Sequence, residues 1–279
     1  MVDNGSAQDS PPPDNSLAPA VSRAMRILDV LADAQGEPVS LADLARAIGV
    51  AKSSTSNICT VLEESGMIHR ETTGFVLGRR TVELGGAYLA SFDQVREFYR
   101  ACQDSAVLQH ELVQLAVLHG TDVIYLARHE GRVPLRLTAG AGVGDRYPAA
   151  LTAIGNALLS TLPPTQVTAL YAGKTFPTLT ARSTRSLEQL HGKLALARER
   201  GYALDEGEVF PNVAGIAMPV PPRSSGDHAF AINLSRIVPT DPPHLEPAEL
   251  ATLKDALSDV VRRLTNPMAI GTSPERTWN

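Results

Sequence analysis

The segment VSLADLARAIGVAKSSTSNICTVLEESGMIHRE (39–71) decides the fold of the first part of this chain. Apolar residues repeat at spacings of three and four over 41–48, which predicts a short helix. Ser40 precedes that helix as an N-cap with a carboxylate three residues further on, and Gly49 follows it as a C-terminal glycine does. A second helix over 51–64 begins at once. Two helices joined by a tight turn that contains Gly predict a helix-turn-helix.

The helix over 51–64 divides into an apolar stripe and a polar N-terminal half. The stripe, at spacings i, i+3, i+4 and i+7, is expected to face the core and consists of Thr55, Ile58, Cys59 and Leu62. A recognition helix enters the major groove by its N-terminal end, with short polar side chains and free backbone amides. The DNA-contacting residues predicted on this helix are Lys52, Ser53, Ser54, Ser56 and Asn57. Taken alone, the same serines also fit a capped helix start that merely faces solvent.

Residues 66–77 predict a β-hairpin directly behind this helix, with the turn at 72–74. A hairpin in that position is a wing, whose tip lies against the phosphate backbone. Arg70 and Thr73 are placed for phosphate contact. A helical pattern that begins at about residue 21 supplies one more predicted DNA contact, Arg23. The order of helix, helix and hairpin predicts a winged helix-turn-helix domain over 19–80.

Charge places a limit on this interpretation. The chain of 279 residues has a formal net charge of −5, and residues 21–80 hold seven Lys or Arg against seven Asp or Glu. Only the face that touches DNA has to be basic. Phosphate neutralisation is therefore expected to contribute only modest non-specific affinity.

Composition excludes several other classes of protein. No apolar run approaches the ~20 residues that cross a bilayer, so no membrane association is expected. Residues 1–18 are polar, carry three consecutive prolines and lack the features of a signal peptide, which predicts a disordered tail and a cytoplasmic protein. The lone Cys59 and Cys102 predict small buried residues and no metal site.

The second half of the chain predicts an α+β domain over 101–266, joined to the first by a linker helix over 81–100 and followed by a flexible tail over 267–279. Strands expected in hairpin pairs, with helices grouped between them, indicate an antiparallel sheet rather than a parallel βαβ array. The expected strands are 112–118, 123–127, 135–138, 202–204, 216–220 and 229–234. The expected helices are 152–159, 187–200 and 247–264.

Six segments in this order resemble the IclR family of bacterial transcriptional regulators. They are SRAMRILDVLA (22–32), residues 39–71, FVLGRRTVELG (75–85), PAALTAIGNALLSTLP (148–163), RERGYALDEGEVFPNVAGIAMPV (198–220) and FAINLSRI (230–237). The resemblance covers about residues 21–265 and implies a sequence-specific regulator with a GAF-like effector-binding domain and no cofactor. Its implied partners are double-stranded operator DNA, a small-molecule effector and further copies of itself, as a homodimer or homotetramer.

The resemblance also implies an effector pocket in the second domain. Its residues would be Ala139, Tyr147, Ala153, Ile154, Asp205, Val213, Gly215, Asn233 and Ser235. Apolar walls, a few polar groups and an exposed helix start suit a small organic acid. Its carboxylate is expected on the backbone amides of residues 153–155, with Asn233 and Ser235 as donors. Without the resemblance, the favoured interpretation of Asn233 is a side chain that bonds a neighbouring backbone group, and that of Asp205, Glu206 and Glu208 is a solvated turn.

Two features set this chain apart from the common family pattern. Asn57 stands where the family commonly has Arg, so the resemblance implies no particular operator sequence. Ile154 and Asn233 stand where smaller residues are common, which predicts an altered pocket and leaves aromatic acids, short keto acids and amino-acid-like ligands open.

Two alternatives to a regulator were considered. An enzyme is disfavoured because the sequence has no G-x-S-x-G elbow, no P-loop and no dinucleotide-binding fingerprint. The other alternative is a sensor module that acts through protein partners and keeps only a vestigial DNA-binding domain. A sequence-selective gel shift distinguishes this alternative from the regulator.

Overall fold

The computed structural model describes residues 16–131, 142–224 and 226–265, and its contacts divide between Ser91 and Phe92 into two compact units. Three predictions lie wholly or largely outside the described residues: the tail over 1–18, the strand at 135–138 and the tail over 267–279. Of the first tail, residues 16–18 are described, and they precede the first helix without helical structure.

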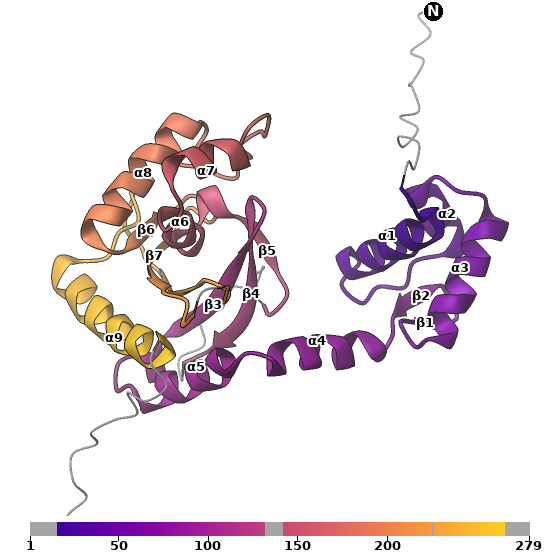
Figure 1. The fold of residues 1–279 in the computed structure, drawn as a ribbon, viewed down its shortest axis with the longest axis horizontal. Coiled ribbons are helices and arrows are strands. Elements are labelled where there is room, and N and C mark those ends of the chain that lie inside the picture. Colours follow the sequence, from indigo (N-terminus) through magenta and orange to yellow (C-terminus); the bar gives the residue numbers. More distant parts are fainter. Residues whose placement is uncertain (1–15, 132–141, 225, 266–279) are drawn as a thin grey trace, which may run out of the picture. The chain divides into compact units, whose positions relative to one another are not determined.

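The N-terminal unit is the predicted winged helix-turn-helix (Figure 1). Its second helix begins at the Ser40 cap, whose hydroxyl accepts the backbone N–H of Asp43 at 3.2 Å. Gly49 ends it in the left-handed conformation at φ 68°, which residues with a side chain adopt only at a cost. The elements are α1 (Pro19–Asp33), α2 (Leu41–Ile48), α3 (Lys52–Glu64), β1 (Ile68–Arg70) and β2 (Phe75–Leu77).

One small apolar core holds these elements together. It contains residues from every element, namely Ile27, Leu31, Leu44, Ile48, Cys59, Leu62, Ile68 and Phe75. The hairpin is fixed to the segment before α2 because Val39 and Phe75 exchange two backbone hydrogen bonds of 2.9 Å each. The predicted apolar stripe of α3 faces this core, with Thr55, Cys59 and Leu62 buried and Ile58 partly buried.

The linker expected as one helix is two helices, α4 (Arg80–Ala90) and α5 (Asp93–Asp104). Phe92 lies between them in an extended conformation. Its ring packs edge-on against His228 and Phe230, with 5.5 Å between ring centroids in each pair. This packing against residues far along the chain explains the break between α4 and α5. The helical periodicity of the sequence does not predict it, because periodicity reflects only neighbouring residues.

The C-terminal unit is built on one six-stranded antiparallel sheet, as predicted, with strand order β5-β4-β3-β8-β7-β6. Residues 146–148, which are not among the expected strands, form the edge strand β5, which pairs with the first residues of β4. The strands are β3 (Leu112–His119), β4 (Asp122–His129), β5 (Arg146–Pro148), β6 (Ala203–Glu206), β7 (Val213–Val220) and β8 (Phe230–Ile237).

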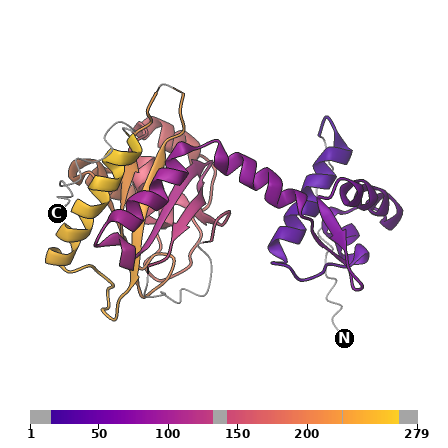
Figure 2. The same cartoon turned by 90° about the horizontal axis from the view of Figure 1, so that it is seen from below.

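Helices cover both faces of this sheet (Figures 1 and 2). On one face α6 (Ala153–Ser160) packs against β7 and β8, and α8 (Leu187–Arg200) packs against α6 and β6. The short η2 (Ala149–Leu151) precedes α6, and α7 (Pro164–Leu170), which the sequence pattern did not predict, follows it. On the other face lie α5, the short η1 (Leu108–His110) and α9 (Pro247–Thr265).

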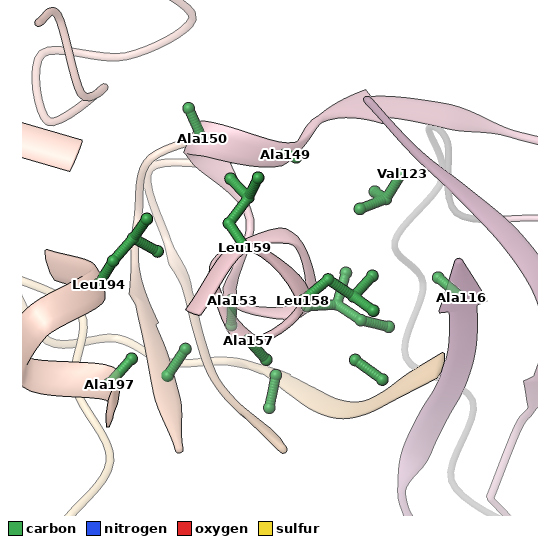
Figure 3. Packing of buried hydrophobic residues seen from close by; sticks show 14 of the residues in the cluster. Ala116, Val123, Ala149, Ala150, Ala153, Ala157, Leu158, Leu159, Leu194 and Ala197 are labelled. Carbon is green, nitrogen blue, oxygen red and sulfur yellow. The ribbon is translucent and has the colours of Figure 1, made fainter. Parts of the chain in front are cut away.

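The core around α6 is made largely of small residues (Figure 3). Ala153 and Ala157 of α6 lie among alanines of the sheet and of α8, with Leu158, Leu159 and Leu194 filling the remaining space. Small side chains let the helix approach the sheet closely. Seven of the eight residues of α6 are buried, so its N-terminal backbone groups lie inside the unit.

Candidate functional site

The first candidate site is the N-terminal half of α3. Lys52, Ser53, Ser54 and Asn57 are exposed, whereas Ser56 is half-buried. The N-cap is Ala51 and provides no side-chain cap, so the serines do not serve as the capping group of this helix. Among the described residues, the side chains of Ser53, Ser54 and Asn57 have no hydrogen-bond partner. The backbone N–H groups of residues 52–54 have no partner within the helix, as at every helix start.

The hairpin supplies the second part of this surface. Thr73 is exposed at the tip. Arg70 lies on β1, where its guanidinium stacks over the Phe75 ring at 4.4 Å and its Nε donates to Glu63 at 3.5 Å. This long contact leaves most of the guanidinium exposed. Arg23 is half-buried on α1, so its side chain is less available than the sequence pattern indicated.

The second candidate site is a cavity of about 40 Å³ in the C-terminal unit, beside the start of α6. It lies on the face of the sheet that carries α6. Of the nine residues expected in the effector pocket, six line this cavity: Tyr147, Ala153, Asp205, Val213, Asn233 and Ser235.

The other three expected residues do not line the cavity within the described chain. Ala139 lies outside the described residues. Ile154 is fully buried in the core around α6 and is not part of the cavity wall. Gly215 is paired with Ser235, and a Cβ at this position would lie 2.8 Å from the Leu234 carbonyl oxygen. The glycine therefore permits close strand pairing.

Five further residues line the cavity that the sequence analysis did not select: Gln114, Tyr125, Thr152, Val209 and Phe210. Gln114 is the buried polar residue of β3, between apolar neighbours on both sides, and stands opposite Asn233 of β8. A polar residue within an apolar stretch of sequence is a signal from which Gln114 could have been identified as a site residue. The ring of Tyr147 meets Tyr125 and Phe210 edge-on, at 6.1 Å in both cases, and no local pattern reports that arrangement.

Asp205 is the ionisable group of this cavity. Its Oδ1 accepts the backbone N–H groups of Gly207 at 3.0 Å and Glu208 at 3.2 Å. Burial nevertheless raises the pKa of Asp205 to about 7. Burial likewise raises the pKa of the nearby Tyr125 and Tyr147 hydroxyls, so both remain protonated donors near neutral pH.

The polar groups at the two ends of the cavity differ. At one end, the Thr152 hydroxyl accepts the N–H of Gly155 at 3.1 Å. Of the three amides expected to hold a carboxylate, only those of Ala153 and Ile154 therefore remain. At the other end, the Asn233 Nδ2 donates to the Ser235 Oγ at 2.9 Å, and its buried Oδ1 has no partner in the described chain. Asn233 was expected as a donor, but its open atom is an acceptor.

The described part of the chain was also compared with the requirements of a metal centre and of a membrane-spanning helix. No three His, Cys, Asp or Glu side chains lie close enough there to share a metal ion. No described helix has both the length and the apolar character needed to cross a bilayer.

Comparisons with known proteins agree with both halves of the structure. Residues 20–72 match the IclR helix-turn-helix domain, and residues 86–265 match the family described as bacterial transcriptional regulator IclR C-terminal. The HTH-type transcriptional regulator XynR of Escherichia coli (strain K12) is 30% identical over 240 residues, which cover 85% of this chain and 92% of XynR.

Solved structures show the same fold. The IclR transcriptional regulator from Alicyclobacillus acidocaldarius superposes with a TM-score of 0.76 at 19% identity, covering 90% of this chain and 98% of the other. An IclR homologue from Microbacterium hydrocarbonoxydans, solved in complex with 4-hydroxybenzoate, gives 0.70 at 22% identity, covering 88% and 98%.

A winged helix-turn-helix followed by this C-terminal domain defines a DNA-binding transcriptional regulator, and the matched domains and relatives are regulators rather than enzymes. The chain belongs to the IclR family.

A first prediction concerns the charge of Asp205. Its raised pKa means that the folded protein holds this proton more tightly than the unfolded chain does. Stability from this group is therefore complete below pH about 4 and is lost as pH rises through about 7. Asp205→Asn is expected to remove up to ~1.4 kcal/mol per pH unit of this dependence. Urea denaturation across this pH range measures it.

The matched control is Glu206→Gln at the exposed next position. It is expected to keep the pH dependence of the wild type. If the free energy of unfolding of Asp205→Asn depends on pH as steeply as that of the wild type, the pH dependence does not come from Asp205.

Proposed function

We propose that this regulator binds its operator through the N-terminal half of α3 and the tip of the hairpin, in the cytoplasm where its DNA target lies. One observation carries this proposal: the exposed donors and acceptors of Ser53, Ser54 and Asn57 have no partner in the described protein and stand beside free helix amides. Such groups recognise base edges and phosphates.

The residues of this surface divide by role. Asn57 is the base-reading residue, because an amide side chain pairs with the N6 and N7 atoms of adenine. Lys52 at the start of α3 and Arg70 on the hairpin contact phosphate, with Thr73 at the tip. Because the net charge of residues 21–80 is zero, the affinity for DNA depends more on the operator sequence than on the overall charge of the unit.

A second prediction tests these roles on DNA taken from upstream of the protein's own gene. Asn57→Ala is expected to cost about 1–3 kcal/mol at the operator and to relax the preference for one base. Lys52→Ala is expected to weaken binding about equally on all sequences and to lower the salt slope by about 1. Fluorescence anisotropy at several salt concentrations measures both effects.

Lys254→Ala, an exposed lysine on α9, is the matched control and leaves binding unchanged. If neither the wild type nor the control selects any upstream sequence over random DNA, the operator proposal fails.

We further propose that the protein acts as a homodimer formed through the N-terminal unit, with a homotetramer as a pair of such dimers. The support is exposed apolar surface. No residue of α4 is buried, and its Val82 is 76% exposed with Leu84 and Tyr88 about half exposed. Helix α1 adds Val21 and Met25. Apolar clusters of this kind mark protein interfaces. A two-fold dimer would bind two operator half-sites whose centres lie about 34 Å apart or a multiple of that spacing.

The third prediction follows from this surface. Val82→Glu places a charge in the proposed interface and is expected to shift the protein toward monomers and weaken operator binding more than tenfold. Leu179→Glu changes an apolar residue of the C-terminal unit that is 50% exposed and keeps the native mass. Light scattering after size-exclusion chromatography measures the mass. Equal masses for the two variants and the wild type would disprove an interface at α4.

We propose that the cavity beside α6 binds the effector, a compact hydroxycarboxylate. Its carboxylate lies on the free amides of Ala153 and Ile154, where the helix dipole favours an anion. Its hydroxyl donates to the Asn233 Oδ1, which otherwise lacks a partner. The cavity volume of about 40 Å³ favours a ligand of few heavy atoms over an aromatic acid. The effector acts by binding more tightly to either the DNA-bound or the free arrangement.

The fourth prediction compares matched acids. Glycolate and lactate are expected to stabilise the protein in a thermal-shift assay more than acetate and propionate, which lack the hydroxyl. The Asn233→Leu variant loses that difference, because it removes the acceptor while keeping the same number of side-chain heavy atoms, and still binds operator. The compound held by the Microbacterium homologue, 4-hydroxybenzoate, serves as the large probe. If 4-hydroxybenzoate raises the melting temperature and neither glycolate nor lactate does, the proposal of a compact ligand is wrong.

A further inference from the structure

A second cavity lies between α6, α8 and β6 and is lined by Asn156, one turn along α6 from Thr152 and Ala153 of the effector cavity. Its volume is about 460 Å³, and it shares no lining residue with the first cavity. The lining is mixed: apolar groups from Leu196, Ala203, Leu204 and Pro242 stand among charged ones. Neither the family resemblance nor the proposed operator and effector sites give this cavity a role.

Asn156 of α6 points to a ligand in this cavity. The residue is 1% exposed and lines the cavity wall. Its Nδ2 donates to the Thr152 carbonyl oxygen at 2.9 Å, which fixes the amide, because the opposite orientation sets two oxygens against each other. The Oδ1 is then left without a partner in the described chain. A buried acceptor in this state favours a ligand that supplies a hydrogen-bond donor.

The charged groups of the cavity show which ligand complements it. Lys193 is already satisfied, because its ammonium pairs with Glu208 and also donates to the Ala150 carbonyl oxygen and the Thr184 hydroxyl. Arg182 pairs with Asp241. Two charges remain: the Glu206 carboxylate, which has no hydrogen bond or ion pair within the described residues, and the terminal nitrogens of Arg200.

Contacts with Tyr202 fix the guanidinium of Arg200 in a position from which it can bind an anion. Its Nε donates to the Tyr202 carbonyl oxygen at 2.8 Å, and its guanidinium lies over the Tyr202 ring at 4.9 Å. This leaves its two terminal nitrogens as a fork suited to a carboxylate. Lys193, Leu196 and Arg200 share one face of α8 and span about 10 Å along its axis. A ligand along this face therefore meets a cation at one end and apolar surface in the middle.

We propose that this cavity is a second ligand site and takes a free amino acid. The ammonium group binds the Asn156 Oδ1 and the Glu206 carboxylate, and the carboxylate binds the terminal nitrogens of Arg200. A simple carboxylic acid leaves Glu206 and Asn156 unpaired, and a simple amine leaves Arg200 unpaired. The zwitterion is the class that satisfies all three groups, and the site does not depend on the proposed effector cavity.

The fifth prediction is tested by calorimetric titration of the full-length protein with zwitterions of increasing length: L-alanine, 4-aminobutyrate and 6-aminohexanoate. At least one is expected to bind ten times more tightly than its matched analogues without the ammonium (propionate, butyrate or hexanoate) or without the carboxylate (ethylamine, propylamine or pentylamine). Equal binding of zwitterion and simple acid, or no binding of any zwitterion, overturns the proposal.

Variants then locate the site. Arg200→Gln and Glu206→Gln change the cavity rim without altering the core, and each is expected to weaken binding of that zwitterion at least tenfold. Glu199→Gln, on α8 but outside the lining, keeps the wild-type affinity.

Asn156→Leu tests the buried acceptor, with circular dichroism to verify folding. A crystal soaked with the bound zwitterion must show it between Asn156 and Arg200, and density in the effector cavity instead contradicts the assignment. Operator binding is not measured, so failure here is separate from failure of the proposed function.

Discussion

The burial of α6 is the constraint on which the C-terminal unit depends. A helix whose start lies inside a protein has backbone N–H groups that water cannot reach, and each must find a partner or a ligand. Thr152 satisfies one of them, at Gly155, and the N–H groups of Ala153 and Ile154 have no partner within the helix, with Ala153 in the cavity wall. The alanines that allow this helix to approach the sheet thus also place a helix start with free N–H groups inside the unit.

The same helix carries a second polar group without a complete set of partners, Asn156. One turn beyond Thr152, Asn156 donates back to its carbonyl oxygen and presents an unpartnered oxygen toward α8 and β6. The turn that carries Asp205 and Glu208 stands between the two cavities: the Glu208 N–H bonds Asp205, and the Glu208 carboxylate pairs with Lys193. A hydrogen bond thus links one lining residue of each cavity, Asp205 of the first and Glu208 of the second.

The N-terminal unit follows a simpler physical plan. One side of α3 is committed to a small core through Thr55, Cys59 and Leu62, and the other side keeps polar groups that the protein leaves unpaired. Helix caps and a hydrogen-bonded Val39–Phe75 bridge hold its helices and hairpin in place without a large core. With no net positive charge over residues 21–80, recognition by this unit depends on the placement of individual groups.

Local chemistry made part of this protein predictable from sequence. Ser40 and Gly49 delimit α2, and the bounds of α8 follow from its periodicity and Gly201, because caps and apolar spacing act within a few residues. The tertiary structure alone decided that Phe92 breaks the linker, that residues 146–148 form an edge strand and that Ile154 faces the core. It also brought Gln114 opposite Asn233, more than a hundred residues away, and left the Asn156 oxygen without a partner. These outcomes depend on strand register and on packing between distant segments, and no short stretch of sequence contains that information.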